Sequence, residues 1–122
     1  MKKIFIMLFL GAGASAAAQT PFADCFFDKT MRFDYYHAGD SRSEEYFFDA
    51  LKEEPYWAGS KVSLVDTTGY GNQFFRIVDR ASGREIYSRG FCTLFNEWQS
   101  TPEADSVRRS YPESVVFPYP KR

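Results

Sequence analysis

The sequence holds few of the residues from which metal sites and nucleic-acid surfaces are built. One histidine and two cysteines occur in 122 residues, whereas a structural zinc site takes four such ligands at close spacing. Lysine and arginine number 15 against 16 aspartate and glutamate residues, for a formal net charge of -1. The chain therefore lacks the excess of positive charge that attracts nucleic acid. These absences exclude zinc fingers and basic nucleic-acid-binding domains, and no cofactor or metal is expected.

Aromatic residues are abundant instead. The chain has 13 Phe, 8 Tyr and 2 Trp, which together make up 19% of it. Hydrophobic residues reach 44% and charged residues 25%, a balance that is typical of a folded chain rather than a disordered one. The length fits a single domain, so we expect one domain with a dense aromatic core.

The amino-terminal segment has the three parts of a secretory signal peptide. Lys2 and Lys3 are followed by an apolar run over residues 4–10 and by small residues that end at Ala18. The apolar run is about half of the roughly 20 residues that cross a bilayer, so we expect no membrane anchor after cleavage. The sequence thus predicts a signal peptide over residues 1–18 and a domain over residues 19–122. The exported protein would remain in the periplasm, stay on the cell surface or be secreted.

Export affects the expected redox state of the two cysteines. Cys25 and Cys92 would enter an oxidising compartment, in which a disulfide between them could persist. The alternative is a pair of free thiols that serve as small apolar residues. Spacing does not decide whether their α-carbons come within reach of each other, so both interpretations stay open.

Most of the chain reads as short strands. Alternating or continuous apolar residues, bounded by Gly, Pro, Asp and Ser, are typical of strands in an antiparallel sheet. The turn at residues 80–83 contains Gly83 and joins two of these runs into a hairpin. The predicted strands cover residues 30–36, 61–66, 73–79, 85–90 and 114–117.

Two other segments complete the prediction. Residues 43–53 are ambiguous, because their Glu, Leu and Lys residues favour a helix and Tyr46–Phe48 favours a strand. Thr101 is suited to cap a short helix that starts at Pro102 and ends before Tyr111. The predicted fold class is therefore all-β, an antiparallel β-sandwich with one short helix near residues 101–109.

Few residues suggest catalysis. His37 is the one candidate for a general base or a metal ligand, and no H-E-x-x-H or second histidine accompanies it, so a surface or hydrogen-bonding role is favoured. The carboxylate pairs Glu44–Glu45 and Glu53–Glu54 would point to opposite faces of a strand, which favours solvated charges over a glycosidase pair. We predict no catalytic residue, no cofactor-binding residue and no metal ligand.

Three further features are weighed as binding elements. Residues 66–72 hold oxygen ligands beside glycines, but their spacing favours ordinary turn chemistry over a calcium loop. A strand residue such as Arg89 would need an acidic partner, for which Asp34 and Glu97 are the candidates. The rings that would form a carbohydrate-binding surface, if they stood out of a polar face, are Trp57, Tyr70 and Trp98.

Four blocks of residues carry a family resemblance. They are Lys29–Arg32 with Asp34–His37 and Gly39; Trp57–Ser60; Ile86–Phe91 with Phe95, Glu97–Gln99 and Thr101; and Glu113–Val115 with Pro118 and Pro120–Lys121. In this order they resemble the N-terminal domain of the M64 (IgA-type) metallopeptidases of Bacteroides-like bacteria. The resemblance spans about residues 22–122.

The resemblance implies a β-sandwich on the amino side of a secreted zinc peptidase. In that family the zinc ligands lie downstream, in a separate domain with an H-E-x-x-H helix, and this sequence has no such motif. No catalytic residue carries over, so an enzyme is not expected from this chain alone. The resemblance also favours a strand at residues 44–49 and implies further strands after Lys121. We therefore expect the sandwich to be incomplete at its C-terminal end, as in a fragment or a truncated gene.

Three hypotheses about function result. The first is an exported, non-catalytic accessory domain that packs on an M64-like catalytic domain, in cis if the chain is a fragment, or that contacts a protein substrate. The second is a stand-alone secreted module that binds glycans or proteins, which an exposed Trp57 or Trp98 would support. The third is a small hydrolase that uses His37 as its base.

Overall fold

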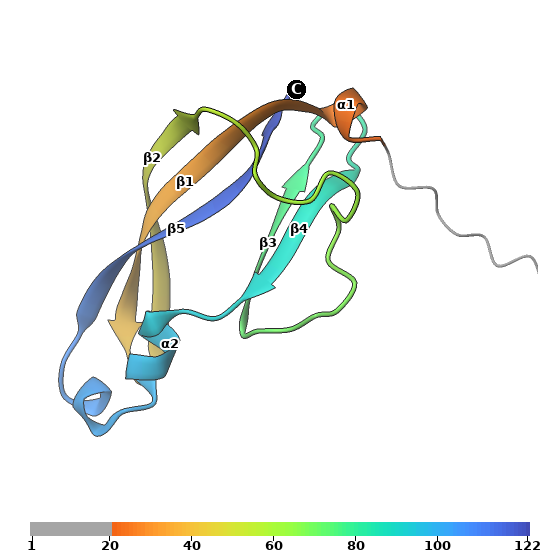
Figure 1. Cartoon of the computed structure of the whole chain (residues 1–122). Helices are drawn as coiled ribbons and strands as arrows, with labels where there is room; N and C mark the ends of the chain where they lie inside the picture. The colour runs from red at the N-terminus through yellow and green to blue at the C-terminus, as the bar shows by residue number, and fades with distance from the viewer. Residues whose placement is uncertain (1–20) are drawn as a thin grey trace, which may run out of the picture.

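The structure, a computed structural model that describes residues 21–122, consists of two antiparallel sheets with short helices (Figure 1). The larger sheet has the strand order β2-β1-β5, and β3 pairs with β4 in the smaller one. The predicted signal peptide over residues 1–18 lies outside the described residues. The elements are α1 (Phe22–Cys25), β1 (Phe26–Asp40), β2 (Ser43–Glu54), β3 (Gln73–Val78), β4 (Glu85–Phe91), α2 (Leu94–Gln99), η1 (Pro102–Asp105) and β5 (Arg109–Pro120).

The sandwich-like arrangement confirms the predicted all-β fold class. The central strand β1 contains the predicted strand 30–36 and pairs with β2 on one side and with β5 on the other. Strand β2 resolves the ambiguity of residues 43–53, since the whole segment is extended. Pairing along β1 together with the strand preference of Tyr46–Phe48 outweighs the helix preference of the flanking Glu and Lys residues.

The predicted strand over residues 61–66 is wrong. This segment is irregular and runs beside β4, where the carbonyl oxygen of Leu64 accepts a hydrogen bond of 3.0 Å from the amide of Ser88. Leu64 is buried while Val62 is 81% exposed. One isolated apolar anchor, rather than an alternating face, therefore holds the segment against the domain.

The predicted helix near residues 101–109 is too long. Only Pro102–Asp105 form a 3-10 turn, and β5 begins at Arg109 and continues through three prolines. Proline is tolerated there because β5 is an edge strand, so an amide can be missing without breaking a ladder on both sides. The short helix α2 was not predicted. Its cap, the hydroxyl of Thr93, accepts a hydrogen bond from the amide of Asn96.

The core is divided into two clusters. The larger one lies between the sheets and is centred on Phe26, Trp57, Tyr87 and Phe117 with their apolar neighbours. The smaller one lies at the far end of β1 and β5, where α2 buries Phe95 and Trp98 against Ala104 and Tyr111. The hairpin β3–β4 thus covers only part of the larger sheet.

Candidate functional site

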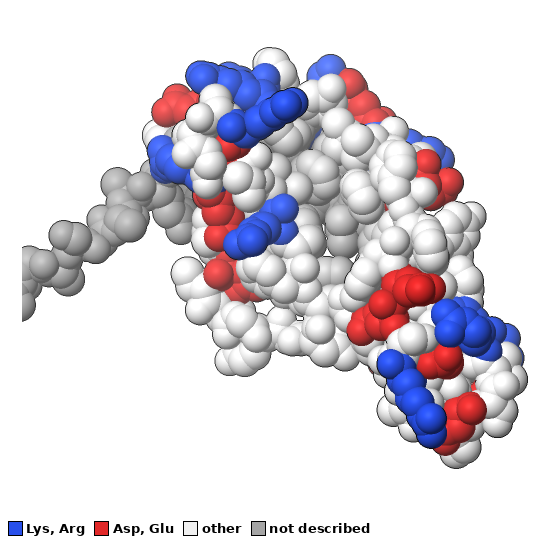
Figure 2. Space-filling view, turned by 180° about the vertical axis from the view of Figure 1, so that it is seen from behind, with Lys and Arg blue, Asp and Glu red and all other residues white. Residues whose placement is uncertain are grey.

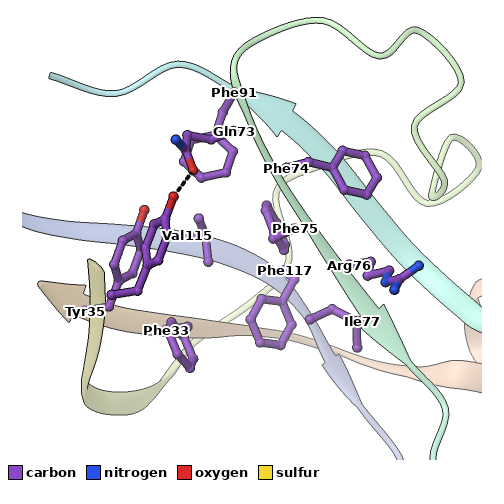
Figure 3. Close-up of a pocket in the computed structure, with 11 residues that line it drawn as sticks. Phe33, Tyr35, Gln73, Phe74, Phe75, Arg76, Ile77, Phe91, Val115 and Phe117 are labelled. Atoms are coloured by element: carbon purple, nitrogen blue, oxygen red, sulfur yellow. Dashed lines mark hydrogen bonds between the residues drawn. The ribbon is translucent and has the colours of Figure 1, made fainter. Parts of the chain in front are cut away.

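An open groove lies between the larger sheet and the β3–β4 hairpin (Figure 3). Its volume of ≈ 460 Å³ is within the range of protein binding pockets. The larger sheet contributes mainly aromatic side chains, and residues 73–77 of β3 form the other wall. The lining residues are Phe33, Tyr35, Tyr46, Gln73, Phe74, Phe75, Arg76, Ile77, Phe91, Val115 and Phe117.

Strand alternation explains why these side chains meet. Residues two apart on a strand share a face, so Phe33, Tyr35 and His37 project from the same side of β1. On β3 the same rule places Phe75 and Ile77 on one side, and Phe75 lies 6.2 Å from the ring of Phe117 on β5, between ring centroids. The groove is therefore the unfilled continuation of the larger core.

The inner face of β2 continues the groove but has no cover. Leu51 pairs with Phe33, Phe48 with Tyr35 and Tyr46 with His37, and directly opposite residues in a sheet share a face. Tyr46, Phe48 and Leu51 are nevertheless 54%, 63% and 53% exposed. We call these three side chains the open β2 face. Together with the groove they form an apolar surface of the kind that marks a protein-interaction site.

A polar cluster closes the groove at the start of β2. His37 is completely buried, with Nε2 at 2.7 Å from Glu44 Oε1 and Nδ1 at 2.9 Å from Glu113 Oε2. Both hydrogen bonds form together when the ring carries two hydrogens or when one carboxyl group is protonated. Glu44 Oε1 also accepts hydrogen bonds from Tyr46 and Gln73, each bond linking β2 or β3 to the cluster.

Two pKa shifts follow from this cluster. Partial burial opposes ionisation of Glu44, but hydrogen bonds from Tyr46, His37, Asn96 and Gln73 outweigh it, so the pKa of Glu44 lies below its usual value. Burial, followed by the hydrogen bond to Glu44, raises the pKa of Tyr46 to about 12. At neutral pH the cluster thus presents an ionised Glu44 and an uncharged Tyr46 at the end of the groove.

The cluster does not have the geometry of a hydrolase site. A general base must come within hydrogen-bond reach of its substrate, and His37 has no exposed surface and holds a carboxylate at each nitrogen. The sequence predicts a surface or hydrogen-bonding role for His37. The hydrogen bonds are present, but the surface position is wrong, because the side chain is completely buried. Within residues 21–122, no group of three His, Cys, Asp or Glu side chains is arranged to hold a metal ion.

The three rings of the predicted carbohydrate surface do not come together. Trp57 is 9% exposed and belongs to the larger core cluster, and Trp98 is 7% exposed and belongs to the smaller one. Tyr70 alone stands out, at 78% exposed. The indole nitrogens are also used internally, since Trp57 donates to the carbonyl of Ser60 and Trp98 donates to Glu103.

Other sequence-based candidates have structural partners of their own. Both cysteines are free, with Cys25 partly buried and Cys92 exposed. Arg89 pairs neither with Asp34 nor with Glu97; it donates to the carbonyls of Leu64, Ser88 and Ser63. The carboxylate of Asp66 accepts hydrogen bonds from Thr68, Gly69 and Gly90, which is turn chemistry and lowers the pKa of that group.

Sequence reasoning missed the open β2 face. Its residues lie in the segment whose pattern was ambiguous, and a bulge at residue 49 shifts the alternation, so that Phe48 and Leu51 share a face although they are three residues apart. Few charged groups lie in this region, among them Arg76 on the groove wall and Glu44 at the groove's end. On the one face that Figure 2 shows, most charged side chains lie toward the two ends of the molecule.

The ends are held by ion pairs. At one end Lys29 pairs with Glu53 and Lys61 pairs with Asp28. At the other end Arg108 reaches Asp40 and Glu45, and Arg109 reaches Glu103. Such exposed pairs contribute little to stability. Further pairs join β1 and β2, where Asp34 lies beside Arg32 and Lys52. No helix of the described part is long and apolar enough to cross a membrane.

Comparison with known proteins agrees with the resemblance found in the sequence. The family model for the peptidase M64 N-terminus matches residues 21–122, which is the whole described chain. The match is to the N-terminal domain, and no catalytic-domain family is detected. A search of curated proteins finds no match. The chain therefore belongs to the peptidase M64 N-terminus family.

Proposed function

We propose that this chain is the exported, non-catalytic accessory domain of an M64-type zinc metallopeptidase and packs on the peptidase domain through the groove and the open β2 face. The observation that supports it is a large uncovered apolar surface on a chain of the M64 N-terminus family. On a free exported domain an exposed apolar patch of this kind promotes aggregation, and a partner that covers the patch prevents it. The periplasm, the cell surface and the medium are all compatible with this role.

The energetics favour a protein partner. Full burial of a Leu or Phe side chain contributes about 1.5–3 kcal/mol, and the three residues of the open β2 face are each more than half exposed. Covering them and filling the groove would contribute several kcal/mol before the cost of association is subtracted. A glycan stacks on exposed rings, and of the three rings predicted for such a surface only Tyr70 is exposed, because Trp57 and Trp98 are buried.

The test is binding of the mature chain to a purified M64 catalytic domain whose H-E-x-x-H glutamate is replaced, measured by calorimetry. We expect a one-to-one complex that weakens at least about tenfold in a Phe48→Ser, Leu51→Ser double variant, because central apolar anchors dominate interfaces. Val62→Ser, at a loop residue that is 81% exposed, is the matched control and should bind normally. Equal binding of all three proteins would contradict the proposed surface.

A second measurement separates the two accessory roles. If the domain holds the substrate instead, the catalytic domain alone should keep its activity on a short peptide and lose activity on a folded protein substrate, and adding the chain in trans should not form a stable complex. Chelator-sensitive cleavage of a protein by the chain alone would contradict an accessory role of either kind.

A further inference from the structure

The two layers of the sandwich have unequal widths. The larger sheet has three strands and the smaller one has two, so one strand of the larger sheet has no strand opposite it. Among the described residues, the strand left uncovered is β2, whose inner face is the open β2 face. A third strand in the smaller sheet would remove the mismatch.

Only one side of the smaller sheet has room for that strand. The outer edge of β4 is already occupied, since the amide of Ser88 donates to the carbonyl of Leu64 at 3.0 Å and the amide of Gly90 donates to Asp66 at 2.7 Å. In the described part of the chain, β3 pairs with β4 and with no other strand. Its second edge therefore presents unpaired backbone groups, which readily accept another strand.

The free edge of β3 lies beside the open β2 face. Gln73, the first residue of β3, donates to Glu44 at 2.7 Å and accepts a hydrogen bond from the hydroxyl of Tyr46 at 2.6 Å, and both partners belong to β2. Figure 3 shows Phe75 and Ile77 of β3 on one side of the groove and Phe33 and Tyr35 of the larger sheet on the other. A strand added to β3 would thus run over β2 and direct alternate side chains into the groove.

The charge on β3 restricts the partner. Arg76 is exposed on the wall of the groove and forms no ion pair within residues 21–122. It stands between Phe75 and Ile77, whose side chains point into the groove (Figure 3). A strand paired with β3 would place a residue of its outer face opposite Arg76, where a carboxylate is favoured.

We propose that β3 accepts an extended segment of a protein partner as the third strand of the smaller sheet, with apolar residues facing the groove and a carboxylate opposite Arg76. The proposal rests on the proposed function in taking the groove as a protein-binding surface, and it names the kind of segment that the surface takes. A second copy that offers its own β3 brings an arginine instead of a carboxylate, so it fits less well. Backbone hydrogen bonds supply affinity in this mode, and the alternating side chains supply specificity.

The test uses fluorescein-labelled peptides and the mature chain. The probe is Ser-Thr-Ile-Glu-Ile-Thr-Ser, and the control peptide has Lys in place of Glu. Two further versions of the probe carry N-methyl groups on alternate amides, one version on the odd-numbered and the other on the even-numbered residues. Successive amides of an extended peptide point to opposite edges, and only one edge can form hydrogen bonds with β3. We expect saturable binding of the probe, at least about tenfold weaker binding of the Lys peptide, and loss of binding for only one methylated version.

The most specific test reverses the charge at residue 76 and in the peptide together. R76E should bind the Lys peptide better than the Glu peptide, and R80E, at the exposed turn after β3, should keep the wild-type preference. Hydrogen exchange should slow at β3 amides when the probe is bound. No saturable binding, equal loss in both methylated versions, or an unchanged preference in R76E would overturn the proposal. A dimer in sedimentation that the probe fails to dissociate would also overturn it.

The outcomes separate this proposal from the accessory role. If the catalytic domain binds the chain and the probe shows no saturable binding, strand addition fails and the accessory role stands. If the probe binds as described and the catalytic domain forms no complex, strand addition stands and the partner is a different protein.

Discussion

The role of His37 in the structure differs from the catalytic role for which the sequence makes it a candidate. In the sequence it is the one candidate for a general base, and in the structure it is completely buried between Glu44 on β2 and Glu113 on β5. The imidazole joins the central strand to both neighbours, so its role is to hold the end of the larger sheet together. The second oxygen of Glu113 is buried with no hydrogen-bond partner among the described residues.

Removal of the imidazole should be costly. His37→Ala would leave two carboxylates without their shared partner in a buried site, and we expect a loss of about 3–5 kcal/mol in the free energy of unfolding. The measurement is urea unfolding followed by tryptophan fluorescence. Tyr36→Ala, at the adjacent residue that is 43% exposed, is the control and should cost much less. A loss below about 1 kcal/mol for His37→Ala would show that the cluster is not structurally important.

Glu103 should make stability depend on pH in the acid range. Hydrogen bonds from Arg109 and then Trp98 lower its pKa from 4.5 to about 2. Because the folded protein favours the ionised form, this stabilisation is complete above about pH 4.5 and is lost as the pH falls toward 2. The difference in free energy of unfolding between wild type and Glu103→Gln should therefore be present at neutral pH and shrink toward zero near pH 2.

The matched control is the nearby exposed Glu97, whose side chain has no hydrogen-bond partner in the described structure. Glu97→Gln should follow the wild-type pH profile. A constant difference between wild type and Glu103→Gln over the whole pH range would contradict the assigned role of Glu103.

At the scale of elements, the β1–β2 turn sets the register of the open β2 face. Gly39 has φ +148°, and a Cβ built there would lie 2.0 Å from the carbonyl oxygen of Ser43. The backbones of β1 and β2 thus approach so closely at this position that only glycine fits. The pairing that aligns Phe48 with Tyr35 depends on this hairpin.

Gly39→Ala should therefore destabilise the protein by more than Gly83→Ala. Both glycines have positive φ values, but a Cβ at Gly83 meets no atom within 4 Å, so its substitution carries only the conformational penalty of about 1–2 kcal/mol. Thermal unfolding of the two variants measures the difference. Equal melting temperatures would mean that the turn relaxes without cost.

Sequence patterns located most strands, and they failed where tertiary contacts decide the structure. The hairpin 73–91 was predictable because its apolar runs flank a glycine turn. Residues 61–66 were mistaken for a strand, since a single buried Leu64 and hydrogen bonds to β4 hold them in an irregular path. In α2 the cap Thr93 and the spacing of Phe95 and Trp98 were signals of a helix, but six residues are too few for a clear helical period.

At the scale of the whole molecule, the unequal layers leave apolar side chains in solvent. Phe48 and Leu51 are more than half exposed, whereas Phe95 is completely buried. The cost of replacing a residue depends on the contacts it loses. The open β2 face should therefore be dispensable for folding of the isolated domain and necessary for its interactions.

The Phe48→Ser, Leu51→Ser double variant should test this separation. We expect a change below about 1 kcal/mol per residue in the free energy of unfolding, together with weaker binding of an apolar dye and less self-association. Phe95→Ala is the contrasting variant and should cost about 3–5 kcal/mol. If the double variant unfolds as readily as Phe95→Ala, the open face is part of the core and not a binding surface.

The sequence by itself determined the strand-rich class, the family and the aromatic character of the core, because alternation, turn residues and residue blocks are local properties of the chain. Tertiary structure decided which rings are buried and which are exposed. Trp57 in the loop after β2 and Trp98 in α2 became core, while Phe48 and Leu51 on β2 became surface. For the two Trp, burial depends on where the loop and the helix pack, and for Phe48 and Leu51, exposure follows from the unequal widths of the two sheets. These contacts join distant parts of the chain, so no segment of sequence encodes them alone.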